Sequence, residues 1–267
     1  MYQTTYHRAS SVAEAVNLLS EAADGKFVSG GQTLIPTMKQ RLAAPSDLID
    51  LRHIPELKGI NVDGRDVRIG AGATHAEVAG HEGLAAICPA ICHLAGHIGD
   101  PHVRHMGTIG GSIANNDPAA DYPAAMLALN AMIHTSKRAL SADEFFTGLF
   151  GTALEEDEIV TAVSFTAPDK AGYAKFPNPA SRYALTGVFV AKRPEGVRVA
   201  VTGAGEDGVF RATGLEEALS NSFDPSALDG ITLPAEGLMS DIHASAEYRA
   251  NLIVVMAKRA VQAAMGG

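Results

Sequence analysis

The chain of 267 residues contains only two cysteines, Cys88 and Cys92. Two cysteines cannot form a disulfide framework, so a small scaffold held by disulfides is excluded. They also cannot supply the four ligands of an iron–sulfur cluster. Long hydrophobic runs are missing too: the longest apolar segments, 84–98 and 252–265, are interrupted by polar residues. Neither reaches the ~20 apolar residues of a membrane-spanning helix.

A surplus of basic residues is also absent. The 21 lysines and arginines are outnumbered by 30 aspartates and glutamates, which gives a formal charge of −9. Proteins that hold nucleic-acid phosphates gain affinity by neutralising negative charge, so nucleic acid is not an expected partner. The opening residues, MYQTTYHRASS, lack a secretory leader, and a cytoplasmic location is therefore the expectation.

Apolar residues make up 46% of the chain and charged residues 19%, ordinary values for a globular protein that exclude wholesale disorder. Residues 1–55 alternate helical and strand-like patterns and predict a small α/β unit. Its first helix follows Ser11, which forms a capping-box spacing with Glu14.

Residues 56–168 predict a second part. Strands are expected at 57–60, from Val67 into the glycines that follow, and at 158–165, around helical segments of which one is broken at Pro89. The third part, 169–267, begins with a loop-like segment, 169–183. Two antiparallel strands joined by a turn at 194–196 and then helices follow it.

Two glycine pairs lie in loops that precede helices: Gly30–Gly31 and Gly110–Gly111. A diphosphate needs several converging backbone N–H donors, and glycine lets the main chain approach closely. Either pair alone is ordinary in a turn, but hydroxyl and amide side chains beside both would suit a ribityl or ribose chain. We expect a valine at position 111 to block this approach and to be incompatible with a positive φ.

Other motifs give no site. Gly203 to Gly208 matches G-x-G-x-x-G, but Glu206 and Asp207 would lie against the pyrophosphate, so a surface turn is expected. On one helix Cys88 and Cys92 would lie opposite His93 and His97, which disfavours a metal site. No nucleotide-binding P-loop, catalytic triad or H-E-x-x-H motif occurs, so no catalytic residue is predicted and a cofactor is expected to carry the chemistry.

The segments 29–42, 69–78, 99–121 and 175–191 resemble the FAD-binding medium subunits of aerobic carbon monoxide dehydrogenases and related xanthine dehydrogenase-type molybdenum hydroxylases. The resemblance covers nearly the whole chain. It implies an α+β fold: a two-part FAD-binding domain of the vanillyl-alcohol-oxidase (PCMH) type over 1–55 and 56–168. A C-terminal domain over 169–267 would have a three-stranded antiparallel sheet and helices.

The same resemblance implies an FAD site, with the two loops at the pyrophosphate, Asn115 and Asp121 at the ribityl chain or phosphates, and Lys175 and Tyr183 near the flavin ring. An acidic Asp121 there is reasonable only if it accepts hydrogen bonds from sugar hydroxyls or fixes the loop. The implied residues are Ser29, Gly30, Gly31, Gln32, Thr33, Leu34, Thr108, Gly110, Gly111, Ser112, Asn115, Asp121, Lys175 and Tyr183.

Members of this family work with a small subunit that carries two [2Fe–2S] clusters and a large subunit that carries the molybdenum cofactor. The resemblance implies that electrons pass from those clusters through FAD to an external acceptor, in a dimer of heterotrimers that is cytoplasmic or peripheral to the inner membrane. Relatives with a cysteine-rich [4Fe–4S] insertion are disfavoured. A free-standing FAD-dependent oxidoreductase with its own substrate and a non-catalytic nucleotide sensor are the alternatives.

Overall fold

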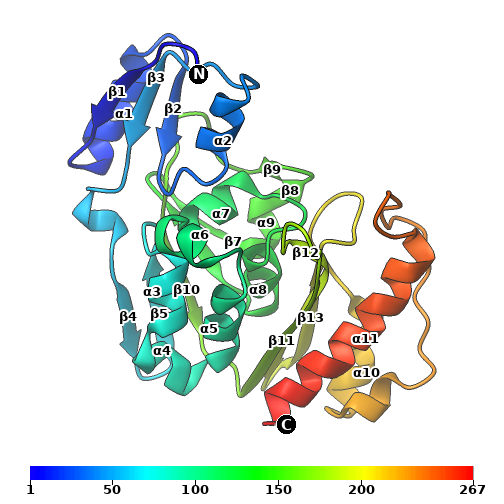
Figure 1. The fold of residues 1–267 in the computed structure, drawn as a ribbon. Coiled ribbons are helices and arrows are strands. Elements are labelled where there is room, and N and C mark those ends of the chain that lie inside the picture. Colours follow the sequence, from blue (N-terminus) through cyan, green and yellow to red (C-terminus); the bar gives the residue numbers. More distant parts are fainter. Residues whose placement is uncertain (267) are drawn as a thin grey trace.

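The computed structural model describes residues 1–266. Three successive β-sheets organise this part of the chain (Figure 1), and a small fourth sheet pairs β8 with β9. The first is a parallel sheet in the order β1-β3-β2, which we call the N-terminal unit together with its two helices. Ser11 caps the first helix as expected, although the Glu14 carboxylate accepts from Ser10 instead. The elements are β1 (Thr5–Arg8), α1 (Val12–Glu21), β2 (Gly25–Val28), α2 (Leu34–Lys39) and β3 (Asp47–Asp50).

The second sheet is antiparallel, in the order β4-β5-β10-β6-β7. Its strands are β4 (Ile60–Asp63), β5 (Asp66–Gly70), β6 (Met132–Thr135), β7 (Ala139–Ser141) and β10 (Val160–Thr166). The strand predicted at 57–60 was placed wrongly. Leu57 ends the 3-10 turn η1 (Pro55–Leu57), and the strand starts only at Ile60, because Gly59 turns the chain with a φ of +90°.

Short helices connect and cover this middle unit. The predicted break at Pro89 is confirmed: one helix ends at Ile87 and the next begins at Pro89, which is tolerated in a first turn. The elements are α3 (His75–Gly80), α4 (Glu82–Ile87), α5 (Pro89–Gly96), α6 (Pro101–Met106), α7 (Ile109–Asn115), α8 (Tyr122–Ala128), α9 (Ala142–Phe145), β8 (Phe146–Gly148) and β9 (Gly151–Thr152).

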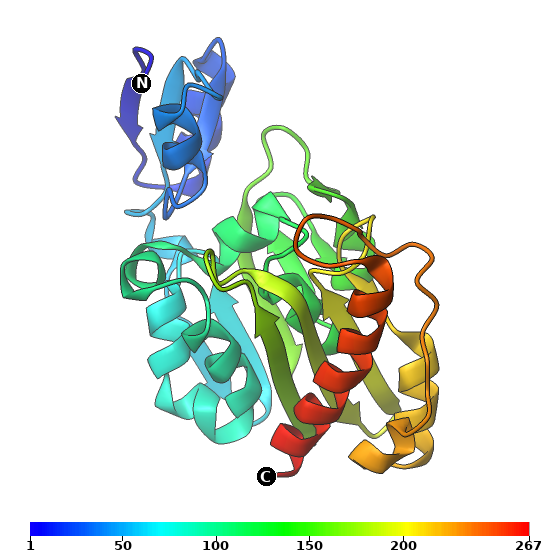
Figure 2. The same cartoon turned by 45° about the vertical axis from the view of Figure 1, so that its right-hand side comes forward.

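The third sheet is antiparallel, in the order β11-β12-β13-β14, and the long helix α11 lies across it (Figures 1 and 2). Three long strands are present as expected, and the two-residue β14 adds a fourth at the edge. The predicted turn at 194–196 joins β12 to β13. The elements are β11 (Lys170–Pro177), β12 (Ala184–Arg193), β13 (Gly196–Thr202), β14 (Phe210–Arg211), α10 (Thr213–Asn221), η2 (Pro225–Leu228) and α11 (Ala246–Met265).

The expectation of a loop over 169–183 was wrong for its first half, because β11 pairs with β12 along its whole length. The segment KAGYAKFP carries small residues where a strand usually has branched ones, so its pattern gave a weak signal. The packing of α11 on this strand explains why residue 172 is a glycine. A side chain there would overlap the carbonyl oxygen of Ala260 on α11.

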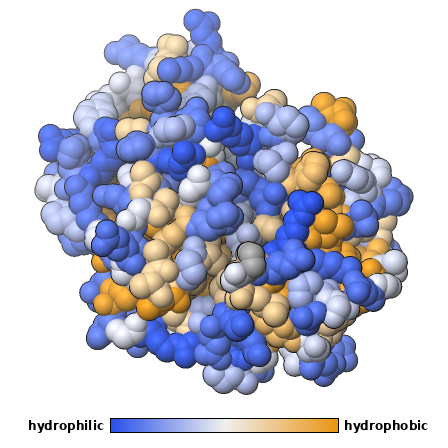
Figure 3. All heavy atoms as spheres, turned by 60° about the horizontal axis from the view of Figure 1, so that its bottom comes forward, coloured by the Kyte–Doolittle hydropathy of each residue, from blue (hydrophilic) through white to orange (hydrophobic). Residues whose placement is uncertain are grey.

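Viewed from below, apolar side chains form small groups among polar ones on the surface (Figure 3). No helix within residues 1–266 is long and apolar enough to span a bilayer.

Candidate functional site

A cavity of about 740 Å³ lies between the N-terminal unit and the middle unit, within the size range of small-molecule sites. The loop between β2 and α2 lines it, as do the loop leading into α7 and residues 181–183. All residues of the predicted FAD site except Lys175 line this cavity, which brings together segments far apart in the sequence.

The first glycine loop, 29–33, packs tightly against the end of α6. A Cβ on Gly30 would overlap the carbonyl oxygen of Met106, and Gly31 has a φ of +68° that favours glycine. Among the described residues, the backbone amides from Gly30 to Thr33 donate no hydrogen bond to any other group of the chain. Four neighbouring amides are therefore free to bind a ligand that lies on this loop.

The second glycine loop uses its own amides internally. The amides of Ile109 and Gly110 donate to the carbonyls of Ala73 and Ala71, at 3.0 and 2.9 Å. A Cβ on Gly110 would lie 2.5 Å from the Cβ of Ala71, so this glycine allows α7 to pack on the end of β5. The two glycine loops thus have different roles.

Thr108 caps the N-terminus of α7 and connects the two loops. Its hydroxyl accepts from the amide of Gly111 at 3.1 Å and lies 3.1 Å from the hydroxyl of Ser29. The expectation of a positive φ at Gly111 was wrong, because this residue lies in the first turn of α7. A Cβ there would meet only the Thr108 hydroxyl, at 3.0 Å.

Asp121 and Lys175 form a buried ion pair at the wall of this cavity, with 2.9 Å between Nζ and Oδ1. Tyr173, which the sequence did not indicate, donates a hydrogen bond to the same carboxylate. Burial raises the pKa of Asp121, and Lys175 and Tyr173 oppose that shift. Lys175 lines a second cavity of about 600 Å³ and also donates to the carbonyl of His97.

The residues after Gly111 divide between the cavity wall and the scaffold. Asn115 and Ser112 line the cavity. Asn116 instead ends α7 in the left-handed region, with a φ of 41°, and its side chain donates to the carbonyls of Gly148 and Gly151. Tyr183 lies at the rim of the cavity and is 46% exposed.

His75 is a lining residue that sequence reasoning did not select. Its side chain is buried, and its backbone amide donates to the carbonyl of Gly107 at 3.0 Å. Burial, helped by the charge of Arg104, lowers the pKa of His75 to about 4. A neutral imidazole therefore lies against Gly107, just before the second glycine loop. A single histidine at the start of a helix carries no sequence pattern that identifies it as a cavity-lining residue.

The rejected motifs are located elsewhere. Gly203 to Gly208 forms a turn between β13 and β14, with Glu206 and Asp207 exposed, as predicted. Cys88 and Cys92 are free and buried. Across residues 1–266, no group of three or more His, Cys, Asp or Glu side chains is arranged to hold a metal ion.

The cavity fits FAD chemically. The free amides of the first loop suit a pyrophosphate, and the hydroxyl and amide groups of Ser112 and Asn115 suit a sugar chain. Phe27, Leu51 and Leu57 line an apolar part that suits a flat ring.

Comparisons with known proteins identify the family of the chain. The family model of the FAD binding domain in molybdopterin dehydrogenase matches residues 2–168. The nicotine 6-hydroxylase medium subunit of Paenarthrobacter nicotinovorans is 36% identical over 96% of this chain and 95% of its own length. The carbon monoxide dehydrogenase medium chain of Afipia carboxidovorans is 38% identical over 97% of this chain and 96% of its own length.

Solved structures give the same result. A chain of the Cu,Mo-CO dehydrogenase in its cyanide-inactivated form superposes with a TM-score of 0.87 at 35% identity, covering 100% of this chain and 99% of that chain. A chain of quinoline 2-oxidoreductase from Pseudomonas putida 86 also reaches 0.87, at 27% identity over 99% of this chain and 98% of its own. The chain therefore belongs to the FAD-binding medium subunits of the carbon monoxide dehydrogenase and xanthine dehydrogenase family of molybdenum hydroxylases, and it is an oxidoreductase subunit with FAD as its cofactor.

Proposed function

We propose that this chain holds FAD in the cavity between the two glycine loops and serves as the electron-transfer subunit of a molybdenum-containing hydroxylase. The observation that carries the proposal is the row of free amides from Gly30 to Thr33 on a cavity that both loops line. When bound, FAD supplies reversible uptake of two electrons. The protein supplies binding, orientation and charge.

Each residue has a proposed role. The amides of 30–33 hold the pyrophosphate, while Thr108 fixes the second loop against Ser29. Ser112 and Asn115 bind sugar hydroxyls. Asp121 accepts from a sugar hydroxyl and fixes the wall; Lys175 balances its charge, so the carboxylate does not repel phosphate as a bare anion would.

Lys175 and Tyr183 remain the proposed residues at the flavin end, with Lys175 acting through the wall that it shares with Asp121. Gln32 and Leu34 are the remaining residues proposed to contact the cofactor. Gly110 and Gly111, whose amides bond within the chain, are proposed to shape the second loop beside it.

The proposed partners are a small subunit with two [2Fe–2S] clusters and a large subunit with the molybdenum cofactor, in a dimer of heterotrimers. The names of the relatives as medium subunits or chains support a complex of several subunits. Electrons would arrive from the partner's clusters and leave to an external acceptor. We also propose a cytoplasmic location, peripheral to the inner membrane through the complex, since the buried free thiols of Cys88 and Cys92 suit a reducing compartment.

We retain the division into 1–55, 56–168 and 169–267 as proposed domain boundaries. The first sheet ends before residue 55, and the third begins after residue 168, which supports both borders.

Co-expression with the two partner subunits tests this function. We expect substrate of the assembled complex to bleach the visible absorbance of the flavin, while the chain alone with FAD stays oxidised in the same substrate. Flavin bleaching by the chain alone would overturn the electron-transfer role and favour the free-standing oxidoreductase. A complex that turns over substrate without reducing its FAD would also contradict the proposal.

A further inference from the structure

Ile159 connects the middle unit to the core of the N-terminal unit. It comes directly before β10, yet its side chain is 3% exposed and packs in a cluster whose other buried members all lie between Ala9 and Leu57. These are Ala9, Ala15, Ile49, Leu51, Ile54 and Leu57. One side chain of the middle unit is therefore inserted into a neighbouring core.

The backbone of Ile159 is held from both sides. Its amide donates to the hydroxyl of Ser136 at 3.1 Å, and the amide of Ser136 donates to the carbonyl of Ile159 at 2.8 Å. Because Ser136 follows directly after β6, these bonds fix Ile159 to the sheet of the middle unit.

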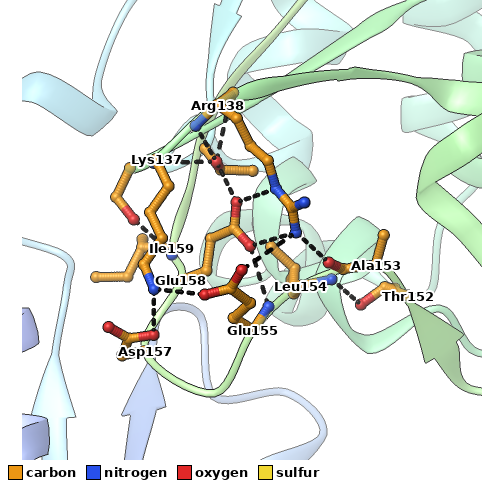
Figure 4. Close-up of polar contacts among 11 residues, drawn as sticks. Lys137, Arg138, Thr152, Ala153, Leu154, Glu155, Asp157, Glu158 and Ile159 are labelled. Carbon is orange, nitrogen blue, oxygen red and sulfur yellow. Dashed lines mark hydrogen bonds and ion pairs between the residues drawn. The ribbon is translucent and has the colours of Figure 1, made fainter.

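The preceding residue, Glu158, is the centre of a polar network (Figure 4). Its carboxylate is fully buried and accepts from the hydroxyl of Thr135 at 2.5 Å and from Arg138 at 3.0 and 3.1 Å. It also accepts from the amide of Glu155 at 3.0 Å, which closes the loop before β10. Hydrogen bonds to a buried charge are stronger than those between neutral groups.

The rest of the network is exposed. Lys137 pairs with Glu155 at 2.7 Å and with Asp157 at 2.6 Å, and all three side chains are accessible to water. Exposed pairs of this kind contribute little to stability. Arg138 is 41% exposed as well, but its partner Glu158 is buried, so this pair is the part of the network that holds the loop in place.

The same loop lines the FAD cavity. Leu154, Glu158 and Ile159 lie on its wall, together with Leu51 and Leu57 of the neighbouring core. A shift of the N-terminal unit around Ile159 would move Gly30 and its free amides relative to the second glycine loop. We therefore expect the width of the cavity to depend on how tightly the Ile159 side chain packs in the core of residues 9–57.

We propose that Glu158 and Ile159 are positioning residues for FAD: the Arg138–Glu158 pair fixes the loop, and Ile159 fixes the angle of the N-terminal unit, so that both glycine loops reach one ligand. This inference rests on the proposed FAD site. Neither residue is assigned a hydrogen bond to the cofactor.

FAD titration of Ile159→Ala, with Ile253→Ala as the matched control, tests the proposal. Ile253 is also a buried isoleucine but lies on α11, in the core of the third sheet. Both variants lose a similar core volume, so both should melt at lower temperature. At a temperature where both are folded, we expect Ile159→Ala to raise the Kd for FAD about tenfold or more, and Ile253→Ala to change it less than about twofold.

Hydrogen exchange on the same proteins, measured without FAD, adds a second readout. Ile159→Ala should speed exchange at the amides of β2 (Gly25–Val28), which is paired with β3, while Ile253→Ala should leave them unchanged. The conservative Ile159→Val should restore most of the affinity, and Glu158→Gln should weaken it at unchanged shape. Equal Kd values for Ile159→Ala and Ile253→Ala would overturn the proposal. Failure of the unmodified chain and Ile253→Ala to bind FAD would instead overturn the FAD site itself.

Discussion

Lys175 and Asp121 form an ion pair across the wall between two cavities. Their charged atoms are 2.9 Å apart, and the side chains are only 5% and 4% exposed. Asp121 lines the larger cavity and Lys175 the smaller one. A buried carboxylate beside a proposed phosphate site is thus neutralised from behind by a lysine of β11, which also ties the third sheet to the middle unit.

Lys175→Met should destabilise the chain strongly, because it leaves the carboxylate of Asp121 buried without its cation. Breaking a buried ion pair by removing one partner costs about 3–5 kcal/mol. The double variant Lys175→Met with Asp121→Asn should lose less than the sum of the two single changes. Urea unfolding of the four proteins measures this coupling, and strictly additive losses would contradict the pairing.

Gly30→Ala should abolish tight FAD binding. A methyl group there overlaps the carbonyl oxygen of Met106, so the first loop must move away from the second. We expect a loss of at least about tenfold in affinity, or ~1.4 kcal/mol. Gly214→Ala is the control, because a Cβ on Gly214 meets no atom within 4 Å. Fluorescence titration with FAD measures the affinity of both variants. Equal affinities of Gly30→Ala and Gly214→Ala for FAD would show that Gly30 is not part of the site.

Gly110→Ala should be more damaging than Gly111→Ala. A Cβ on Gly110 would lie 2.5 and 2.7 Å from the Cβ and carbonyl oxygen of Ala71, whereas a Cβ on Gly111 meets only a hydroxyl at 3.0 Å. Overpacking of this kind costs about 1–3 kcal/mol. Thermal melts rank the two variants, and the reverse order would show that the second loop packs differently.

The stability of the chain should fall as the pH drops from about 6.5 to 4. Burial holds the pKa of His75 at about 4 in the folded state, below its value of ~6.5 when unfolded, so the unfolded chain binds the extra proton in this window. The contribution of His75 reaches at most ~1.4 kcal/mol per pH unit. His75→Gln should flatten this part of the profile, measured by urea unfolding at each pH. A profile that keeps its slope in the variant would assign the effect to other groups.

The sequence predicted the parts that depend on local chemistry. Glycine pairs before helices indicated both loops, and Pro89 indicated a helix break, since these residues restrict or free the backbone on their own. Strands β1 and β11 were not predicted, because they depend on packing and pairing with other elements rather than on a pattern in their own residues. β1 is four residues long and mostly exposed, and β11 uses a glycine to fit under α11.

The candidate site shows the same division. Residues of the two loops could be named from motifs, but Tyr173, His75 and Ile159 enter only through long-range packing. No spacing along the chain relates Ile159 to the core of residues 9–57. The sequence also could not show that the two loops use their amides differently. Both contain a glycine pair, but only the first loop leaves its amides without a hydrogen bond within residues 1–266.

The most direct measurement is a spectroscopic FAD titration of the purified chain, alone and co-purified with its partner subunits, followed by release and identification of the bound flavin. We expect one FAD per chain, both for the chain alone with added FAD and in the assembled complex, and we expect Gly30→Ala to fail to retain it under the same conditions. A correctly assembled complex whose medium subunit carries no FAD, or one that retains FAD fully despite Gly30→Ala, would contradict the two-loop site.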